Sequence, residues 1–296
     1  SHLEGFKKIQ SEALKIKLEP KYIVTAFGHV VNDLFKIWLA EVLEKKKSKL
    51  VISSHGGYVE SCINFNSWIN ISDKFISWEK SNEKKVSQLP PLNFKNNKKN
   101  SIGKNKNILF CTSNTNLYAY RIQDYVISSQ IVECFKFWKN LFDSMSDNIK
   151  DKIVIRHVPN FDPWNQKEKL NKLFVHNAIS QKKNFVDELK RSKIVINTAM
   201  QTTFFESMSF GVPTLVLLNN DLWNLSVKGK IIYEKLKANK IIFNNVDKLN
   251  QHLEEIYEQP NLWWNTEKIL KVRQEFHDHY CKKNNFNKWN EFFNNL

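Results

Sequence analysis

The side chains best suited to chemistry stand where an apolar run gives way to a helical pattern. The apolar run ends at Asn197, a polar turn follows, and a helix is predicted to begin at Thr202. The first turn of a helix has free N–H groups and a partial positive charge, which favour a phosphate. Threonine hydroxyls can bond to the same oxygens, and a carboxylate one turn later can accept hydrogen bonds from both hydroxyls of a ribose. This spacing indicates a nucleotide site formed by Thr198, Gln201, Thr202, Thr203 and Glu206.

The same residues also have a purely structural explanation. Gln201, Thr202 and Thr203 can cap the helix, and Glu206 is a favourable charge near its positive end. Spacing alone leaves both explanations open.

A second motif, His55-Gly56-Gly57, directly follows a predicted strand. Parallel α/β sheets place their ligands beyond the carboxyl ends of their strands. The two glycines would let a substrate approach the backbone, and a histidine ordinarily titrates near neutral pH, as a general base requires. His55 is therefore the candidate catalytic base. The alternatives are a turn in which His55 bonds to the backbone, or His29, after the first predicted strand, as the base.

Only four of the 45 basic residues are arginines, so their positions are informative. Arg121 and Arg156 are predicted to lie at or just beyond strand ends, where a guanidinium can bind a phosphate through two parallel hydrogen bonds. The alternative for each is a surface ion pair. His157, beside Arg156, can stack on a nucleotide or hydrogen-bond to it. Arg156 is the favoured phosphate ligand, and Arg121 is left open.

The formal net charge of +15 admits a polyanionic partner, such as nucleic acid or an anionic membrane. Nucleic-acid-binding proteins rely on arginine, however, and expose aromatic side chains, whereas here lysines dominate and the aromatic residues follow buried patterns. We therefore interpret most lysines as solvated surface and expect no nucleic-acid partner. A basic nucleic-acid-binding protein remains the alternative.

Several function classes lose support because their motifs are missing from the sequence. It has no dinucleotide-binding, P-loop, hydrolase or zinc-protease motif, and no apolar stretch long enough to span a membrane. No Asp-x-Asp motif stands at a strand end, so no metal ion is expected for chemistry. The four cysteines are far apart, which fits a reducing cytoplasm.

Short apolar runs alternate with helical patterns, which predicts an α/β fold with parallel sheets. Strands are predicted at 22–26, 50–53, 74–78, 108–112, 152–156, 194–197, 213–218 and 241–243. Helices are predicted at 6–17, 32–46, 128–145, 202–210, 231–236, 246–258 and 266–281, with Gly211 ending the 202–210 helix and another helix around Leu170. Residues 277–279 (His-Asp-His) are expected to be solvated surface.

The segment 80–106 has Pro90-Pro91, a run of Lys and Asn, and little to bury, so it is predicted to be a linker or surface loop. It divides the chain into two predicted lobes. Residues 1–95 would form the end of an N-terminal lobe with the linker. Residues 96–296 would form a C-terminal lobe with the C-terminal helices.

Residues 202–206 (Thr-Thr-Phe-Phe-Glu), followed by 211–214 (Gly-Val-Pro-Thr), resemble the donor site of GT-B glycosyltransferases, in which a helix-borne glutamate holds the ribose. Nearly the whole chain also resembles a family of transferases from bacterial surface-carbohydrate loci, first catalogued in Leptospira. Further elements of that resemblance are Phe35-Lys36 with Ala40-Glu41, 50–57, 72–78, 118–122, 155–159 and Trp263-Trp264, the last interpreted as core packing.

The chain departs from this family in three ways. Ser54 stands where the family usually has Gln before His-Gly-Gly, and Pro163-Trp164 stands where it usually has Gly-Trp. Family members are also about twice as long. The chain is therefore expected to be truncated in its N-terminal lobe.

The resemblance implies a GT-B-like α/β fold with two Rossmann-like lobes, of which 1–95 would be on the acceptor side and 96–296 would bind the nucleotide donor. It also implies transfer of a sugar or related group from a nucleotide-activated donor to a glycan or lipid-linked glycan of the cell envelope. His55 would take the acceptor proton, while Arg156, the helix N-terminus, Thr202 and Thr203 would neutralise the leaving phosphate. The nucleotide sugar is the substrate, no cofactor is expected, and similarity to glycerophosphate and ulosonate transferases favours cytidine. The expected location is the cytoplasm, including the inner face of an anionic membrane. A non-catalytic lobe that binds a sugar nucleotide or glycan is a third hypothesis.

Overall fold

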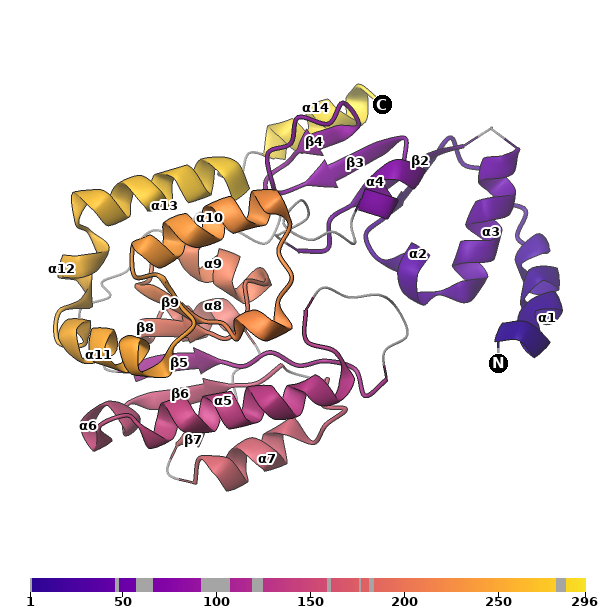
Figure 1. Cartoon of the computed structure of the whole chain (residues 1–296). Coiled ribbons are helices and arrows are strands. Elements are labelled where there is room, and N and C mark those ends of the chain that lie inside the picture. The colour runs from indigo at the N-terminus through magenta and orange to yellow at the C-terminus, as the bar shows by residue number, and fades with distance from the viewer. Residues whose placement is uncertain are drawn as a thin grey trace.

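Two parallel β-sheets, one in each half of the chain, form the framework of this computed structural model (Figure 1). The structure describes residues 2–45, 48–56, 66–91, 107–118, 125–158, 161–175, 177–180, 184–280 and 286–296. None of the described helices is long and apolar enough to cross a lipid bilayer.

The N-terminal lobe is built on a four-stranded sheet. Its elements are α1 (His2–Leu14), β1 (Tyr22–Thr25), α2 (Gly28–Val31), α3 (Asp33–Glu44), β2 (Lys49–Ser53), α4 (Asn66–Ile71), β3 (Lys74–Ser77) and β4 (Val86–Gln88). The strand order is β1-β2-β3-β4, and all neighbouring strands are parallel. One face packs against α1, α3 and α4 through a core that includes Ile23, Leu50, Trp38 and Phe75.

The C-terminal lobe is built on a six-stranded sheet in the order β10-β9-β8-β5-β6-β7, again with only parallel pairs. Its elements are β5 (Asn107–Cys111), η3 (Ser128–Gln130), α5 (Ile131–Asp143), α6 (Asp147–Lys150), β6 (Ile153–Arg156), α7 (Gln166–Leu173), β7 (Ala178–Ile179), α8 (Phe185–Leu189), β8 (Ser192–Asn197), α9 (Thr202–Phe210), β9 (Thr214–Leu217), η4 (Asn220–Leu222), α10 (Val227–Ala238), β10 (Ile242–Phe243), α11 (Val246–Ile256), α12 (Pro260–Trp264) and α13 (Glu267–Tyr280), followed by α14 (Phe286–Asn294). All eight strands predicted from the sequence are present.

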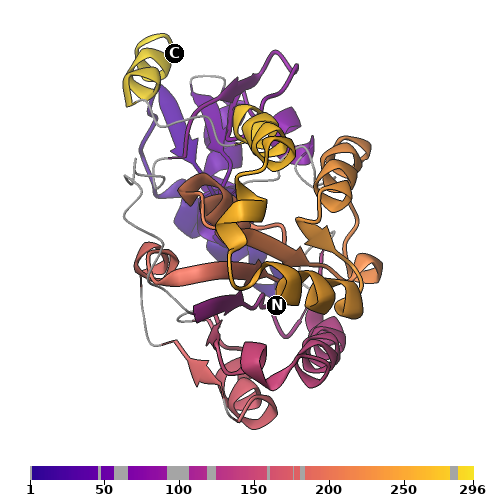
Figure 2. The same cartoon turned by 90° about the vertical axis from the view of Figure 1, so that its left-hand side faces the viewer.

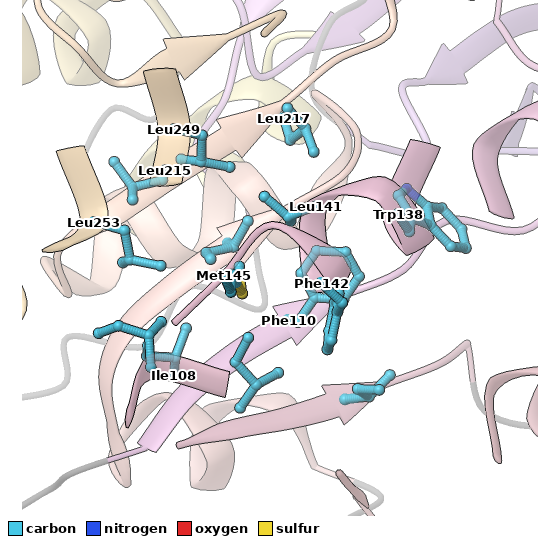
Figure 3. Close-up of a cluster of buried hydrophobic side chains, with 14 of the residues drawn as sticks. Ile108, Phe110, Trp138, Leu141, Phe142, Met145, Leu215, Leu217, Leu249 and Leu253 are labelled. Atoms are coloured by element: carbon cyan, nitrogen blue, oxygen red, sulfur yellow. The ribbon is translucent and has the colours of Figure 1, made fainter. Parts of the chain in front are cut away.

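The larger core of this lobe lies between its sheet and helices α5, α7 and α11 (Figure 3). Ile108 and Phe110 of β5 face this core, whereas Leu109 between them faces the opposite side of the sheet. The opposite side is covered by α8, α9, α10 and α13. Because both faces are covered, the strands read as continuous apolar runs in the sequence.

The path of the chain through this sheet changes direction between β5 and β8. From β5 the chain moves outward to β6 and β7, and it then returns to β8 on the other side of β5. Helix α5 lies on one side of the sheet, and α9 and α10 lie on the other (Figure 1). Open α/β sheets bind ligands at the carboxyl ends of the strands where this switch occurs.

The two lobes are joined by buried contacts near the end of α13. Trp78, directly after β3, packs into the C-terminal core. The carbonyl oxygen of His279 accepts hydrogen bonds from the amide of Lys80 at 2.7 Å and from Nε2 of Gln88 at 2.9 Å. Nε2 of His279 lies 3.3 Å from the fully buried carboxylate of Glu79. The expectation that 277–279 is only solvated surface is therefore wrong for His279, because α13 ends against the N-terminal lobe.

The last helix returns to the N-terminal lobe. α14 lies beside β4 in Figure 1 and with the N-terminal strands in Figure 2. Trp289 packs against the face formed by Val51, Ile76 and Leu89, and its Nε1 donates a hydrogen bond to the carbonyl of Pro90 at 2.9 Å. This helix thus covers the face of the N-terminal sheet opposite α1, α3 and α4.

Local predictions fare differently in two places. Gly211 ends α9 with φ of 84° and its carbonyl accepts a hydrogen bond from Trp264, which is 1% exposed, so the predicted helix stop and core packing are confirmed. The segment 80–106 was predicted to hold little that could be buried. However, this segment contains β4, which pairs with β3, and Leu89 is buried. The prediction of a linker or surface loop is therefore wrong for 86–89. Residues 92–106 lie outside the described residues.

Candidate nucleotide site at the carboxyl ends of β5 and β8

A buried polar network ties together the loops that follow β5 and β8. The hydroxyl of Thr198 accepts a hydrogen bond from the amide of Ser113 at 2.9 Å and donates one to the carbonyl of Cys111 at 3.0 Å. The fully buried Gln166 of α7 donates to the carbonyl of Ser113 at 2.7 Å and accepts from the hydroxyl of Thr112 at 3.3 Å. These bonds hold both loops in place at the topological switch. The hydroxyl of Thr198 is used in this network, so its role is to position the loops.

Helix α9 begins at this edge without a side-chain cap. Gln201 occupies the N-cap position, but its side chain makes no capping hydrogen bond. Within the described part of the chain, nothing accepts a hydrogen bond from the amides or hydroxyls of Thr202 and Thr203. The capping explanation therefore fails for the Gln201 side chain, and the first turn keeps donors that an anion can use.

Glu206 lies one turn into α9 and is partly buried. Burial raises its pKa from 4.5 to about 7, and the positive charge of Arg156 opposes this rise. Its carboxyl group makes no hydrogen bond within the described residues. A ligand that donates hydrogen bonds to Glu206 would therefore meet a group that is poised to ionise near neutral pH.

Strands β6, β5 and β8 end in a row of three side chains in register, Arg156, Cys111 and Asn197. Registered residues of parallel neighbours point to the same face, and here that face is the one covered by α8. Arg156 is only 7% exposed and forms an ion pair with Glu188 of α8. The surface ion pair considered as an alternative is thus a buried one, and it holds the guanidinium close enough to Glu206 to influence its pKa.

The His-Gly turn after β2 reaches the same place from the other lobe. The exposed ring of His55 stacks on Phe27, with ring centroids 5.0 Å apart and planes 20° apart. Next to it, a Cβ atom added to Gly56 would lie 2.8 Å from Oγ1 of Thr202. The structure therefore brings together the two motifs that stood far apart in the sequence.

Other predicted residues take less direct positions. Nδ1 of the half-buried His157 lies 3.0 Å from the carbonyl oxygen of Val158. Gly57 and Arg121 lie outside the described residues. Among the residues that the structure describes, no three His, Cys, Asp or Glu side chains gather closely enough to hold a metal ion.

Comparison with known proteins decides the family. The model of the LIC12162 family transferase matches residues 1–295, which is almost the whole chain. The chain belongs to this family. The resemblance noted in the sequence is confirmed, and the family description confirms the prediction of a transferase. No curated protein matches the sequence.

The fold of this LIC12162 family member is similar to that of solved structures. TarM superposes with a TM-score of 0.52 at 11% identity, over 97% of this chain and 57% of TarM. WaaG, a glycosyltransferase involved in lipopolysaccharide biosynthesis, gives 0.48 at 11% identity, over 95% of this chain and 96% of WaaG. The wall teichoic acid polymerase TagF gives 0.44 at 11% identity, over 94% of this chain and 81% of TagF. With both parallel sheets, the likeness to TarM confirms the predicted GT-B-like fold. The chain spans a little over half the length of TarM.

Three residues of the site were missed in the sequence of this family member. Glu188 pairs with Arg156 from a helix 32 residues away, and Gln166 bonds from α7 to the loop after β5, so neither carries a local signal. Asn197 did carry one, since it is a polar residue ending an apolar strand. It is fully buried, and among the residues that the structure describes neither its side-chain oxygen nor its side-chain nitrogen has a hydrogen-bond partner.

Gly56→Ala tests the contact between the lobes. The added Cβ would force the Thr202 hydroxyl to rotate or the turn to move, so we expect nucleotide affinity to fall roughly tenfold, as for a lost hydrogen bond to a charged group. Gly5→Ala is the matched control, because its Cβ would be 4.0 Å from Ile9 on α1. Calorimetric titration with a nucleoside diphosphate measures both. Equal affinities for Gly56→Ala and the wild type would show that Thr202 does not bind the ligand.

Proposed function

We propose that this protein transfers a sugar or related group from a nucleotide-activated donor to a cell-envelope glycan. The observation that carries the proposal is the start of α9, where uncapped amides, the hydroxyls of Thr202 and Thr203, and Glu206 gather at the topological switch of the C-terminal sheet. The LIC12162 transferase family supports the same reaction class.

On the donor side, the proposed contacts follow the geometry of α9. The diphosphate accepts hydrogen bonds from the first amides and the two threonine hydroxyls, and the ribose hydroxyls donate to Glu206. Arg156 is held by Glu188, so its proposed part is a fixed positive charge beside the site, which favours the charge that develops on the leaving phosphate. In this proposal Gln201 and His157 add contacts at the rim of the site, and Thr198 holds the loops after β5 and β8 together.

On the acceptor side, the proposed base is His55. One of its ring nitrogens takes the proton of the acceptor hydroxyl while the acceptor oxygen forms its new bond to the transferred group. The bond between that group and the nucleotide phosphate breaks, and its electron pair stays on the phosphate. The amides of α9 and Arg156 stabilise that charge, so the proposed mechanism requires no metal ion.

The proposed substrates follow from the resemblance of the sequence. A cytidine nucleotide is the favoured donor, because the chain is similar to glycerophosphate and ulosonate transferases. The proposed acceptor is a glycan or lipid-linked glycan at the cytoplasmic face of the membrane. The net charge of +15 supports peripheral contact with anionic lipids there.

A melting experiment with nucleotides tests the proposal. A ligand at about 100 times its Kd stabilises the folded state by about 2.7 kcal/mol, so CDP should raise the melting temperature by several degrees. Cytidine and inorganic pyrophosphate each engage only half of the site, so each should raise it less. If none of CDP, UDP, GDP and ADP raises the melting temperature, the proposed donor site is wrong.

A further inference from the structure

Four rings form one cluster at the carboxyl edge of the N-terminal sheet. His29 of α2 lies edge-on to Trp68 of α4, with ring centroids 4.7 Å apart and planes 84° apart. Phe27 contacts Trp68 at 6.4 Å and stacks on His55 at 5.0 Å. The rings follow β1 and β2 or come from α4, so His29 belongs to the same edge as the proposed base.

The imidazole of His29 is buried without hydrogen bonds to any described residue, which is unusual for a histidine side chain. Both of its ring nitrogens are shielded from solvent, and within the described residues neither has a hydrogen-bond partner. Most buried polar groups in proteins are bonded, because an unbonded one loses its hydration without compensation. If the only role of this ring were to pack against Trp68, a phenylalanine would serve equally well, and it has no polar atoms that lose their hydration.

The surroundings keep His29 uncharged. Burial, and to a lesser extent the positive charge of Lys36, lower its pKa from 6.5 to about 4. Lys36 itself is paired with Asp33 at 2.8 Å. A neutral imidazole has one N–H donor and one acceptor nitrogen, which is the complement of a hydroxyl group.

We propose that His29 and Trp68 form a subsite for a hydroxyl-bearing sugar ring of the acceptor, in which a sugar hydroxyl bonds to an imidazole nitrogen and the apolar side of the ring packs on the indole. This inference rests on the proposed glycosyl-transfer function and names the residues that would bind a sugar of its glycan acceptor. On binding, the imidazole would turn about its Cα–Cβ bond to present a nitrogen to the sugar, at the cost of its edge-on contact with Trp68. Phe27, which contacts both Trp68 and His55, places a sugar bound there next to the proposed base.

His29→Phe is the decisive variant, because it keeps a ring against Trp68 and removes both nitrogens. Binding of methyl hexopyranosides (gluco, galacto, manno and N-acetylglucosamine forms) is measured by saturation-transfer NMR. We expect the wild type to bind at least one of them, and His29→Phe to bind it about five- to tenfold more weakly, with a melting temperature that is unchanged or higher. His29→Gln, which keeps one donor and one acceptor, should recover part of the loss.

His252→Phe is the matched control. His252 is also buried and lies edge-on to a tryptophan, Trp263, with centroids 4.9 Å apart, but it is on α11, in the core of the other lobe. The His252→Phe variant should bind the glycosides as tightly as the wild type does. The inference is overturned if the wild type binds no glycoside of the panel, or if His29→Phe binds as tightly as the wild type.

Two further readouts keep the result unambiguous. If His29→Phe does not fold, glycosides added to the wild type must shift the imidazole NMR signals of His29 and leave those of His252 in place. The absence of such a shift would overturn the subsite. Titration of the same samples with CDP reports separately on α9. If the wild type binds a glycoside but not CDP, the proposed donor site is wrong and the proposed sugar subsite is still supported.

Discussion

His55→Ala should slow transfer by about 10²–10⁴-fold, the contribution of a positioned general base, and should leave nucleotide affinity unchanged. The reason is that the proposed base and the proposed nucleotide site belong to different lobes. His55 stands on the turn after β2, stacked on Phe27, whereas the donors for the nucleotide belong to α9. A base on the acceptor side changes the chemical step and not the binding of the donor.

Two quantities are measured for the wild type and for His55→Ala: the transfer rate with saturating donor and the Kd of the nucleotide. His277→Ala is the control, because this histidine on α13 has no part in the proposed mechanism, and the variant should transfer at the wild-type rate. A wild-type rate for His55→Ala would assign His55 to the turn alone. Loss of nucleotide binding would instead move it to the donor pocket.

Much of the fold was predictable because its main signals are local. Strands covered on both faces form continuous apolar runs, as at 194–196 and 215–218, and Gly211 marks the end of α9. β4 was missed because it is three residues long, lies at the edge of the sheet and is only partly buried. α2 was missed because one turn carries no periodicity.

The site was predictable only where it is contiguous in sequence. Thr202, Thr203 and Glu206 share one helix, so their spacing sufficed. The ion pair between Arg156 and Glu188 and the contact between Gly56 and Thr202 join distant segments, and only the folded chain shows them. The raised pKa of Glu206 likewise arises from tertiary burial.

That raised pKa leads to the second large expected effect, a pH-dependent nucleotide affinity that Glu206→Gln removes. Ribose hydroxyls donate to an ionised carboxylate, so binding favours the deprotonated form. With a pKa of about 7, Glu206 is mostly protonated at pH 6 and mostly ionised at pH 8, so affinity should rise about tenfold between these values. Glu206→Gln should bind roughly 10- to 100-fold more weakly than the wild type at pH 8.

The same group affects the stability of the free protein with a definite sign. Because the folded state raises the pKa of Glu206, it binds the proton more tightly than the unfolded state. The free energy of unfolding is therefore highest below pH 4.5 with respect to this group and falls as pH rises toward 7, by at most about 3 kcal/mol. Glu206→Gln lacks this loss, so at pH 8 the free variant should melt above the free wild type. Melting curves at pH 5 and pH 8 measure both proteins.

Calorimetric titration of CDP into the wild type and Glu206→Gln at pH 6 and pH 8 tests the nucleotide site most directly. Glu275→Gln, an exposed glutamate on α13, is the matched control, and any pH dependence left in Glu206→Gln belongs to the phosphates of CDP. We predict that the wild type and Glu275→Gln bind about tenfold more tightly at pH 8 than at pH 6, beyond the change shown by Glu206→Gln. Equal affinities of the wild type and Glu206→Gln at both pH values would contradict a nucleotide held by Glu206.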